Sequence, residues 1–165
     1  MLKQCIATLV VIALGLSVSA CGSSQAVVRQ MDRGSAVLTK FRVETIDDHS
    51  GSAVPSTFLT EIRSYLESDL TQHHLNASEG EAANRIRIEV VSYRMRGGVT
   101  RAMFGMMAGK DGVESKVTVL PPTAPQVLGE TNISTYNVMA VGGADDIARM
   151  HADAILKFLT GETKK

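Results

Sequence analysis

Apolar positions recur along the first half of the chain with two different periods. Residues 36–46 alternate between apolar and polar, which predicts a strand with one buried face made of Val37, Thr39, Phe41 and Val43. A turn-rich stretch follows, and apolar residues then repeat at helical spacing to about His74. This spacing predicts one long helix whose buried stripe contains Phe58, Leu59, Ile62, Leu66 and Leu70.

A second alternating stretch, residues 85–96, changes phase at the doublet Val90-Val91. Beyond the doublet, two apolar side chains alternate with two arginines: Tyr93, Arg94, Met95 and Arg96. An unbroken period of two would bury the arginines, whereas one extra residue at the doublet would turn the apolar pair inward. Because burying two unpaired guanidinium groups is costly, we expect a β-bulge there, with both arginines outside.

The rest of the chain predicts a hairpin and a closing helix. Residues 113–120 and 126–138 are expected to be strands joined by the turn PPTAP. Residues 142–161 are expected to form a helix that Gly161 ends. The resulting order, β-α-β-β-β-α, predicts an α+β fold with a four-stranded mixed, largely antiparallel sheet. Each helix has one apolar stripe, so both are expected on the same face of the sheet, and the other face should be wetter.

The N-terminus reads as a secretory signal. One lysine, Lys3, precedes an apolar run from Ile6 to Val18 that ends in small residues. That run is shorter than the roughly 20 residues that a membrane-spanning helix needs. Val18-Ser19-Ala20-Cys21 resembles the bacterial lipobox, and the resemblance implies that Cys21 becomes the first mature residue. It would then carry a diacylglyceryl thioether and an N-acyl chain such as palmitate.

The lipobox resemblance also suggests a location. Several acyl chains, each worth about 0.8 kcal/mol per CH₂, are enough for stable anchoring without a spanning segment. In Gram-negative lipoproteins an aspartate after the cysteine commonly retains the protein at the inner membrane, and here that residue is Gly22. We therefore expect a protein that is lipid-anchored in the outer membrane and faces the periplasm.

Composition limits the classes of function. Removing 20 of the 165 residues leaves a mature chain of 145, which suits one domain, and no thiol remains besides Cys21. The mature chain has 16 Lys and Arg against 17 Asp and Glu, so its net charge does not select nucleic acid. Aromatic residues make up only 4% of the chain, which leaves few rings for stacking on bases or sugars. We expect no cofactor, no bound metal and no nucleic-acid partner.

The expected organisation has four parts. Residues 1–20 are the signal peptide, and residues 21–35 are the lipidated cysteine with a polar, flexible tether. Residues 36–162 form one α+β domain, and residues 163–165 are a tail. The Phe-containing first strand, the stretch YRMRGGVTR and the glycines after it resemble small bacterial lipoproteins of a family of unknown function. Their domains are similar to periplasmic assembly modules such as that of the curli secretion channel, and the resemblance implies no catalytic activity.

Residues 97–112 are a candidate docking loop. Four large apolar side chains lie between glycines, with basic residues at the flanks: Met103, Phe104, Met106 and Met107. Flexible thioethers suit an adaptable contact surface for a partner or a membrane. The alternative is a long hairpin connection whose methionines fold back onto the domain's own core.

A row of arginines is the second candidate site. It could form an anion-binding face for phosphates or carboxylates, and its members are Arg85, Arg87, Arg94, Arg96 and Arg101. The alternative is a solvated face that carboxylates on nearby strands neutralise, with Glu89, Glu114 and Glu130 as the available partners.

These patterns favour a non-catalytic binding, accessory or assembly module, with an envelope protein or a second copy of the chain as its partner. One alternative is a subunit of a membrane-associated oligomer that inserts residues 97–112. Another is an envelope hydrolase whose catalytic residues are too scattered along the sequence to recognise.

Overall fold

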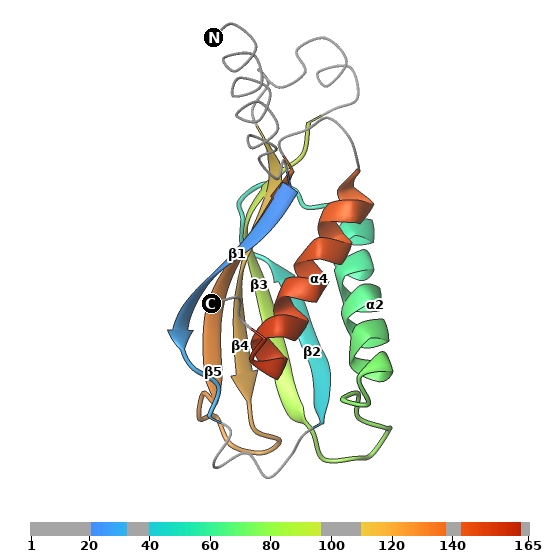
Figure 1. The fold of residues 1–165 in the computed structure, drawn as a ribbon, viewed down its shortest axis with the longest axis vertical. Coiled ribbons are helices and arrows are strands. Elements are labelled where there is room, and N and C mark those ends of the chain that lie inside the picture. The colour runs from blue at the N-terminus through green and yellow to red at the C-terminus, as the bar shows by residue number, and fades with distance from the viewer. Residues whose placement is uncertain (1–20, 33–39, 97–109, 138–142, 163–165) are drawn as a thin grey trace, which may run out of the picture.

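Two helices pack on one face of a five-stranded sheet (Figure 1). The computed structural model describes residues 21–32, 40–96, 110–137 and 143–162. The strands are β1 (Cys21–Arg29), β2 (Phe41–Asp48), β3 (Asn84–Arg94), β4 (Asp111–Leu120) and β5 (Gly129–Asn137). The helices are α2 (Ser56–Gln72) and α4 (Ala144–Thr160). The α+β class and the placement of both helices on one face are as the sequence predicts.

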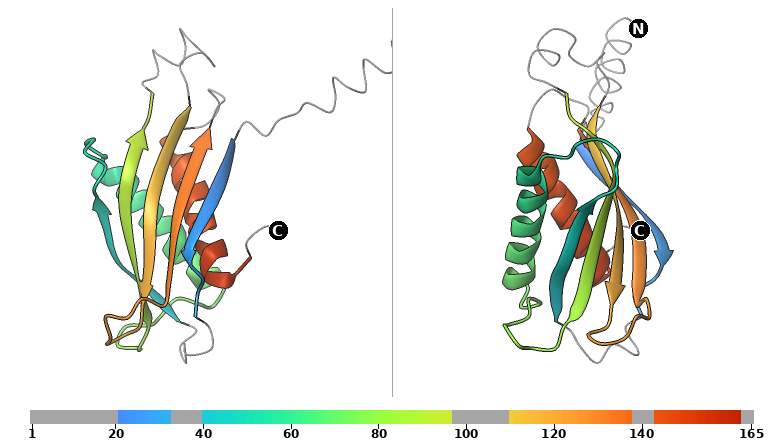
Figure 2. Two further views of the ribbon diagram at one scale, coloured as in Figure 1. Left: turned by 90° about the vertical axis from the view of Figure 1, so that its left-hand side faces the viewer. Right: turned by 180° about the vertical axis from the view of Figure 1, so that it is seen from behind.

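The strand order across the sheet is β1-β5-β4-β3-β2. Strands β2 and β3 are parallel and are connected through α2, while every other pair is antiparallel. Turned by 90°, the sheet shows β1 at one edge and β2 at the other (Figure 2). The predicted β-α-β-β-β-α order is therefore present, and one strand precedes it.

That additional strand corrects the prediction of four strands and of a flexible tether. β1 occupies Cys21–Arg29, within the segment expected to be a tether, and pairs along its length with β5. The segment shows no alternation of apolar residues, because the side chains that face β5 and α4 are polar and form hydrogen bonds with them. Ser23 Oγ lies 3.0 Å from Thr135 Oγ1, and Gln25 Nε2 donates to the carbonyl oxygen of Ala154 in α4 at 2.6 Å.

The bulge predicted in β3 is present. The β3–β4 register shifts between Val90 and Ser92, and Tyr93 and Met95 pack against the core while Arg94 is exposed. The prediction that Arg96 lies outside is wrong. Arg96 is buried, because Asp111 at the start of β4 supplies the carboxylate that compensates its charge.

The core lies between the sheet and the helices. The predicted stripe of α2 is buried at Phe58, Ile62, Leu66 and Leu70, and Leu59 is partly buried. In β2, Phe41 and Val43 are buried as predicted, whereas Val37 and Thr39 lie outside the described residues. Helix α4 ends at Gly161, whose φ of 79° is the left-handed conformation that glycine adopts most easily. No helix within the described residues is long and apolar enough to cross a membrane.

Candidate functional site

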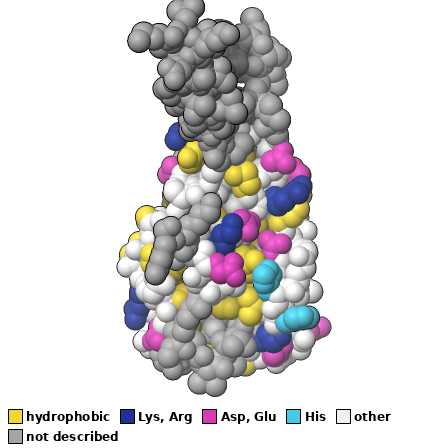
Figure 3. All heavy atoms as spheres, viewed as in Figure 1, with side chains coloured by type: hydrophobic (Ala, Val, Ile, Leu, Met, Phe, Trp, Pro, Cys, Tyr) yellow, Lys and Arg dark blue, Asp and Glu magenta, His cyan; other side chains and the backbone are white. Residues whose placement is uncertain are grey.

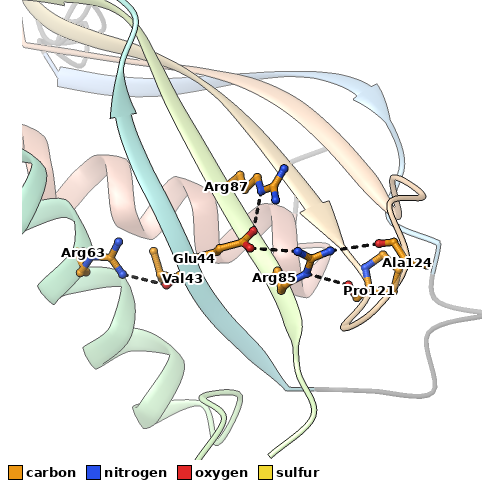
Figure 4. A network of polar contacts seen from close by, with 7 residues as sticks. All are labelled: Val43, Glu44, Arg63, Arg85, Arg87, Pro121 and Ala124. Atoms are coloured by element: carbon orange, nitrogen blue, oxygen red, sulfur yellow. Dashed lines mark hydrogen bonds and ion pairs between the residues drawn. The ribbon is translucent and has the colours of Figure 1, made fainter. Parts of the chain in front are cut away.

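The face of the sheet opposite the helices carries two members of the predicted arginine row, Arg85 and Arg87. Arg85 and Arg87 project from β3 beside Glu44 of β2, and one carboxylate serves both guanidinium groups (Figure 4). Arg85 NH1 donates to Glu44 Oε1 at 3.0 Å, and Arg87 Nε donates to Glu44 Oε2 at 2.6 Å. The hydrogen bond from Arg87 is the main reason that the pKa of Glu44 lies below its ordinary value.

Arg85 is also bound to the turn between β4 and β5. Its Nε donates to the carbonyl oxygen of Pro121 at 3.1 Å, and its NH2 donates to that of Ala124 at 3.2 Å. With Glu44 included, the Arg85 guanidinium has three acceptors from two elements. This residue therefore clamps the PPTAP turn to β2, which is a structural role, and its donors are directed at the protein.

The remaining arginines of the row do not form a shared surface with this pair. Arg94 is exposed, Arg96 is buried, and Arg101 lies outside the described residues, as do Met103, Phe104, Met106 and Met107 of the docking loop. Elsewhere on the sheet, Lys116 Nζ lies 3.1 Å from Glu130 Oε2. The two signs of charge are also interspersed over the described residues of the helix-bearing face (Figure 3).

Arg96 and Asp111 form a buried ion pair at the base of the β3–β4 connection. Asp111 Oδ1 accepts from the backbone N–H of Arg96 at 2.7 Å and from its Nε at 2.9 Å, and Oδ2 accepts from NH2 at 3.3 Å. The two side chains are 4% and 3% exposed. This bidentate ion pair joins the second residue after β3 to the first residue of β4.

A chain of polar contacts, buried at Ser115, Thr135 and His151 and exposed at Ser23, joins three strands to α4. His151 Nε2 lies 2.7 Å from Ser115 Oγ on β4, and its Nδ1 lies 2.9 Å from Thr135 Oγ1 on β5. Thr135 Oγ1 in turn contacts Ser23 Oγ on β1. His151 is completely buried, and desolvation lowers its pKa from 6.5 to about 4, so the imidazole is neutral near pH 7.

The Ser115–His151 pair has the spacing of a nucleophile and its base, but its surroundings differ from those of such a dyad. Ser115 is 1% exposed, so a substrate has no access to its hydroxyl group in this conformation. The second ring nitrogen contacts a threonine hydroxyl in place of a carboxylate. The arrangement satisfies a buried histidine and holds α4 against the sheet.

Sequence reasoning missed the partners that organise these clusters. Glu44 lies on β2, parallel to β3, and the sequence gives no sign that it meets the arginines. Asp111 falls within the predicted docking loop, residues 97–112, and Ser115 and Thr135 look like ordinary strand residues. Their inward direction could have been read from the alternation of β4 and β5. Among the described residues, no three His, Cys, Asp or Glu side chains lie close enough together to hold a metal ion.

Comparison with known proteins supplies the family. Residues 23–143 match the model of the domain of unknown function DUF4410. The chain belongs to this family. The match begins within β1, so the edge strand that the sequence pattern failed to predict is part of the DUF4410 domain. No curated protein matches the chain. A family of unknown function agrees with the resemblance noted from the sequence, whereas the likeness to the curli channel domain stays a prediction.

Solved structures share the fold of this DUF4410 chain. A PelC dodecamer from Paraburkholderia phytofirmans matches with a TM-score of 0.59 and 14% identity, over 84% of this chain and 96% of the PelC chain. A single-residue variant of that dodecamer gives a TM-score of 0.58 with the same identity and coverage. At this identity the likeness concerns the fold alone. A candidate lipoprotein from Caulobacter crescentus matches with a TM-score of only 0.42 and 14% identity, over 77% of this chain and 93% of its own, and we infer nothing from it.

Proposed function

We propose that this protein is a lipid-anchored component of the bacterial envelope that acts as a non-catalytic accessory or assembly module. In this proposal it faces the periplasm from the outer membrane. The observation that carries the proposal is the position of Cys21. It follows directly on an apolar, signal-like run that ends in Val18-Ser19-Ala20, and it is the first residue of the first strand. Gly22, in place of an aspartate, supports the outer membrane over the inner one.

A binding role is favoured because the polar clusters among the described residues are engaged with one another. Glu44 holds two arginines, Asp111 holds a third, and the buried histidine contacts two hydroxyl groups. An envelope hydrolase would need a reactive group in a cleft, and the Ser115–His151 pair is buried. We therefore propose interaction with an envelope protein or with a second copy of the chain.

Self-association is a second candidate with its own observation. The similar PelC structures are dodecamers. In this chain β1 lies at the edge of the sheet and presents Val28, which is 60% exposed. An edge strand carries backbone groups that can pair with another chain. Of the two edge strands of the described sheet, β1 is the one with exposed large apolar side chains, Val27 and Val28, so we propose β1 as the contact with a neighbouring subunit.

Crosslinking in intact cells, followed by purification from the membrane fraction, tests both candidates. A stoichiometric partner protein would support the accessory role, and a ladder of multiples of the chain mass would support the oligomer. The same experiment with Cys21→Ser should give little crosslinked material, because the chain would no longer be concentrated on the membrane. A wild-type chain that stays monomeric and without partners on the membrane would contradict the proposal.

A further inference from the structure

Cys21 begins β1 and lies in one row with residues of two other strands. It pairs with Asn137 at the end of β5, and Asn137 pairs on its other side with Asp111 at the start of β4. Strand β3 ends at the same side of the sheet, where Arg94 pairs with Gly112. The start of β1 and the start of α4 both lie at this end of the domain (Figures 1 and 2). We call it the anchor end.

The first strand is fixed to the domain close to Cys21. Ser23 Oγ contacts Thr135 Oγ1 and also donates to the carbonyl oxygen of Met150 in α4 at 3.4 Å. Gln25 adds its bond to α4 two residues later. A free tether of 14 residues could extend to roughly 45 Å. Because β1 is paired with β5 from Cys21 onward, Cys21 instead stays at the edge of the domain. Acyl chains on Cys21 would therefore pull the anchor end itself onto the bilayer.

The side chains at the anchor end suit a lipid surface. The exposed Lys110 has its Nζ 4.4 Å from the centre of the Tyr136 ring. Tyr136 lies opposite Gly22, the residue after the anchor, and its hydroxyl is 3.4 Å from where a Cβ of Gly22 would be. Tyrosine is enriched at membrane interfaces, and lysine attracts anionic headgroups.

Three acidic side chains near the anchor end, Asp48, Asp145 and Asp146, are bound locally, while Asp47 is exposed. Asp48 accepts from the backbone N–H groups of Ser50 and Val54. Asp145 contacts Tyr65 and Arg149, and Asp146 accepts from the N–H of Gly143. The opposite end carries charges of both signs, since its loop after α2 contains Glu79 and Glu81 and Arg42 donates to the carbonyl oxygens of Ser78 and Glu81. The position of Cys21 and the Lys110–Tyr136 pair therefore favour the anchor end for contact with an anionic bilayer.

We propose that the domain stands end-on upon the membrane, with the anchor end against the lipid headgroups and the PPTAP turn farthest from them. This inference rests on the proposed lipidation of Cys21. It identifies the contacting surface as Lys110, Tyr136 and the start of β1. The far end, with the β4–β5 turn, is left facing the periplasm.

Fluorescence quenching in vesicles tests this orientation. The mature chain has no thiol besides Cys21, so Lys110→Cys and Thr123→Cys each create a unique labelling site on the acylated protein. The two sites lie at opposite ends of β4, about 34 Å apart along ten strand residues. In vesicles of phosphatidylethanolamine and phosphatidylglycerol with a headgroup-attached nitroxide quencher, the label at 110 should lose most of its emission. The label at 123 should keep it.

A lengthened anchor provides the matched control. Inserting 12 Gly and Ser residues after Gly22 gives a coil with a span of about 20 Å, which should reduce the quenching at 110 toward that at 123. Equal quenching at both sites or stronger quenching at 123 would each overturn the orientation. A mature chain without acyl groups, seen by mass, would overturn the proposed function and the orientation with it. An acylated chain with equal quenching would overturn the orientation alone.

Discussion

Ser115 and His151 join the sheet to α4 through a contact of 2.7 Å between Oγ and Nε2, and both side chains are buried. Through Thr135 the same contact extends to Ser23, two residues from Cys21 in the sequence. The edge strand that would carry the lipid is thus tied to the centre of the domain. A change in the charge of His151 should therefore alter the stability of the whole domain.

The pH dependence of unfolding tests that expectation. Burial holds the pKa of His151 at about 4, whereas the unfolded histidine titrates near 6.5. Between these values the unfolded state binds more protons, so the free energy of unfolding should fall as the pH falls from 6.5 to 4. The loss should reach roughly 3 kcal/mol, at 1.36 kcal/mol per pKa unit.

Urea titrations from pH 7.5 to pH 4.5 would measure this effect. The control is His151→Gln, which keeps an uncharged donor and acceptor and should remove this part of the pH dependence. Carboxylates such as Glu44 titrate in both proteins, so their effect cancels when the two profiles are compared. Parallel profiles for the two proteins would contradict a buried, neutral histidine.

Asp111→Asn should destabilise the domain strongly. The substitution leaves the Arg96 guanidinium buried without its carboxylate, and breaking such a pair costs about 3–5 kcal/mol. The double variant Arg96→Met and Asp111→Leu removes both charges and should recover most of the loss. Chemical denaturation of the three proteins measures the differences. A single variant as stable as the wild type would show that the ion pair is not formed in solution.

Glu44→Gln should convert the neutralised arginines into an anion-binding surface. The charges involved are between a quarter and a half exposed, so the stability cost should be only about 1 kcal/mol. Retention on a heparin column should increase, because Arg85 and Arg87 would lose their shared counter-charge. Glu114→Gln, at an exposed position on β4, removes one negative charge as a control. Equal retention of the two variants would contradict a specific role for Glu44.

Val28→Lys should weaken self-association without unfolding the domain. Val28 is an exposed residue of the edge strand, and a lysine there disfavours pairing with another chain. Val91→Lys is the matched control, because Val91 is 46% exposed but lies on β3 inside the sheet. Crosslinking should give a shorter ladder for the first variant only. Equal ladders for both variants would exclude β1 as the subunit contact.

The sequence predicted those parts of the fold whose residues pack by hydrophobic burial. The stripe of α2 and the bulge after Val90 follow from periodicity and from the cost of burying Arg94, and the structure confirms both. The same reasoning failed for Arg96 because it assumed an unpaired charge. The carboxylate that pairs with it lies 15 residues further along the chain, and only the folded hairpin brings the two together.

β1 could not be found from hydrophobic pattern because its inward residues are polar. Ser23 and Gln25 bind backbone and hydroxyl oxygens of α4 and β5, so the strand shows no alternation in hydropathy. The histidine contacts were also hidden, since a serine or threonine on a strand gives no sign of which side chain it meets. An edge strand whose side chains are held by hydrogen bonds can be recognised only when the elements that supply the partners are known.

The mass of the mature N-terminal peptide tests the central claim most directly. Protein purified from a Gram-negative host's membranes should begin at Cys21 and carry the mass of a diacylglyceryl group plus an N-linked acyl chain. Cys21→Ser should accumulate as the unprocessed precursor or as a chain released from the membrane. A wild-type chain that begins at Cys21 with a free thiol, or that still contains residues 1–20, would contradict the lipid anchor.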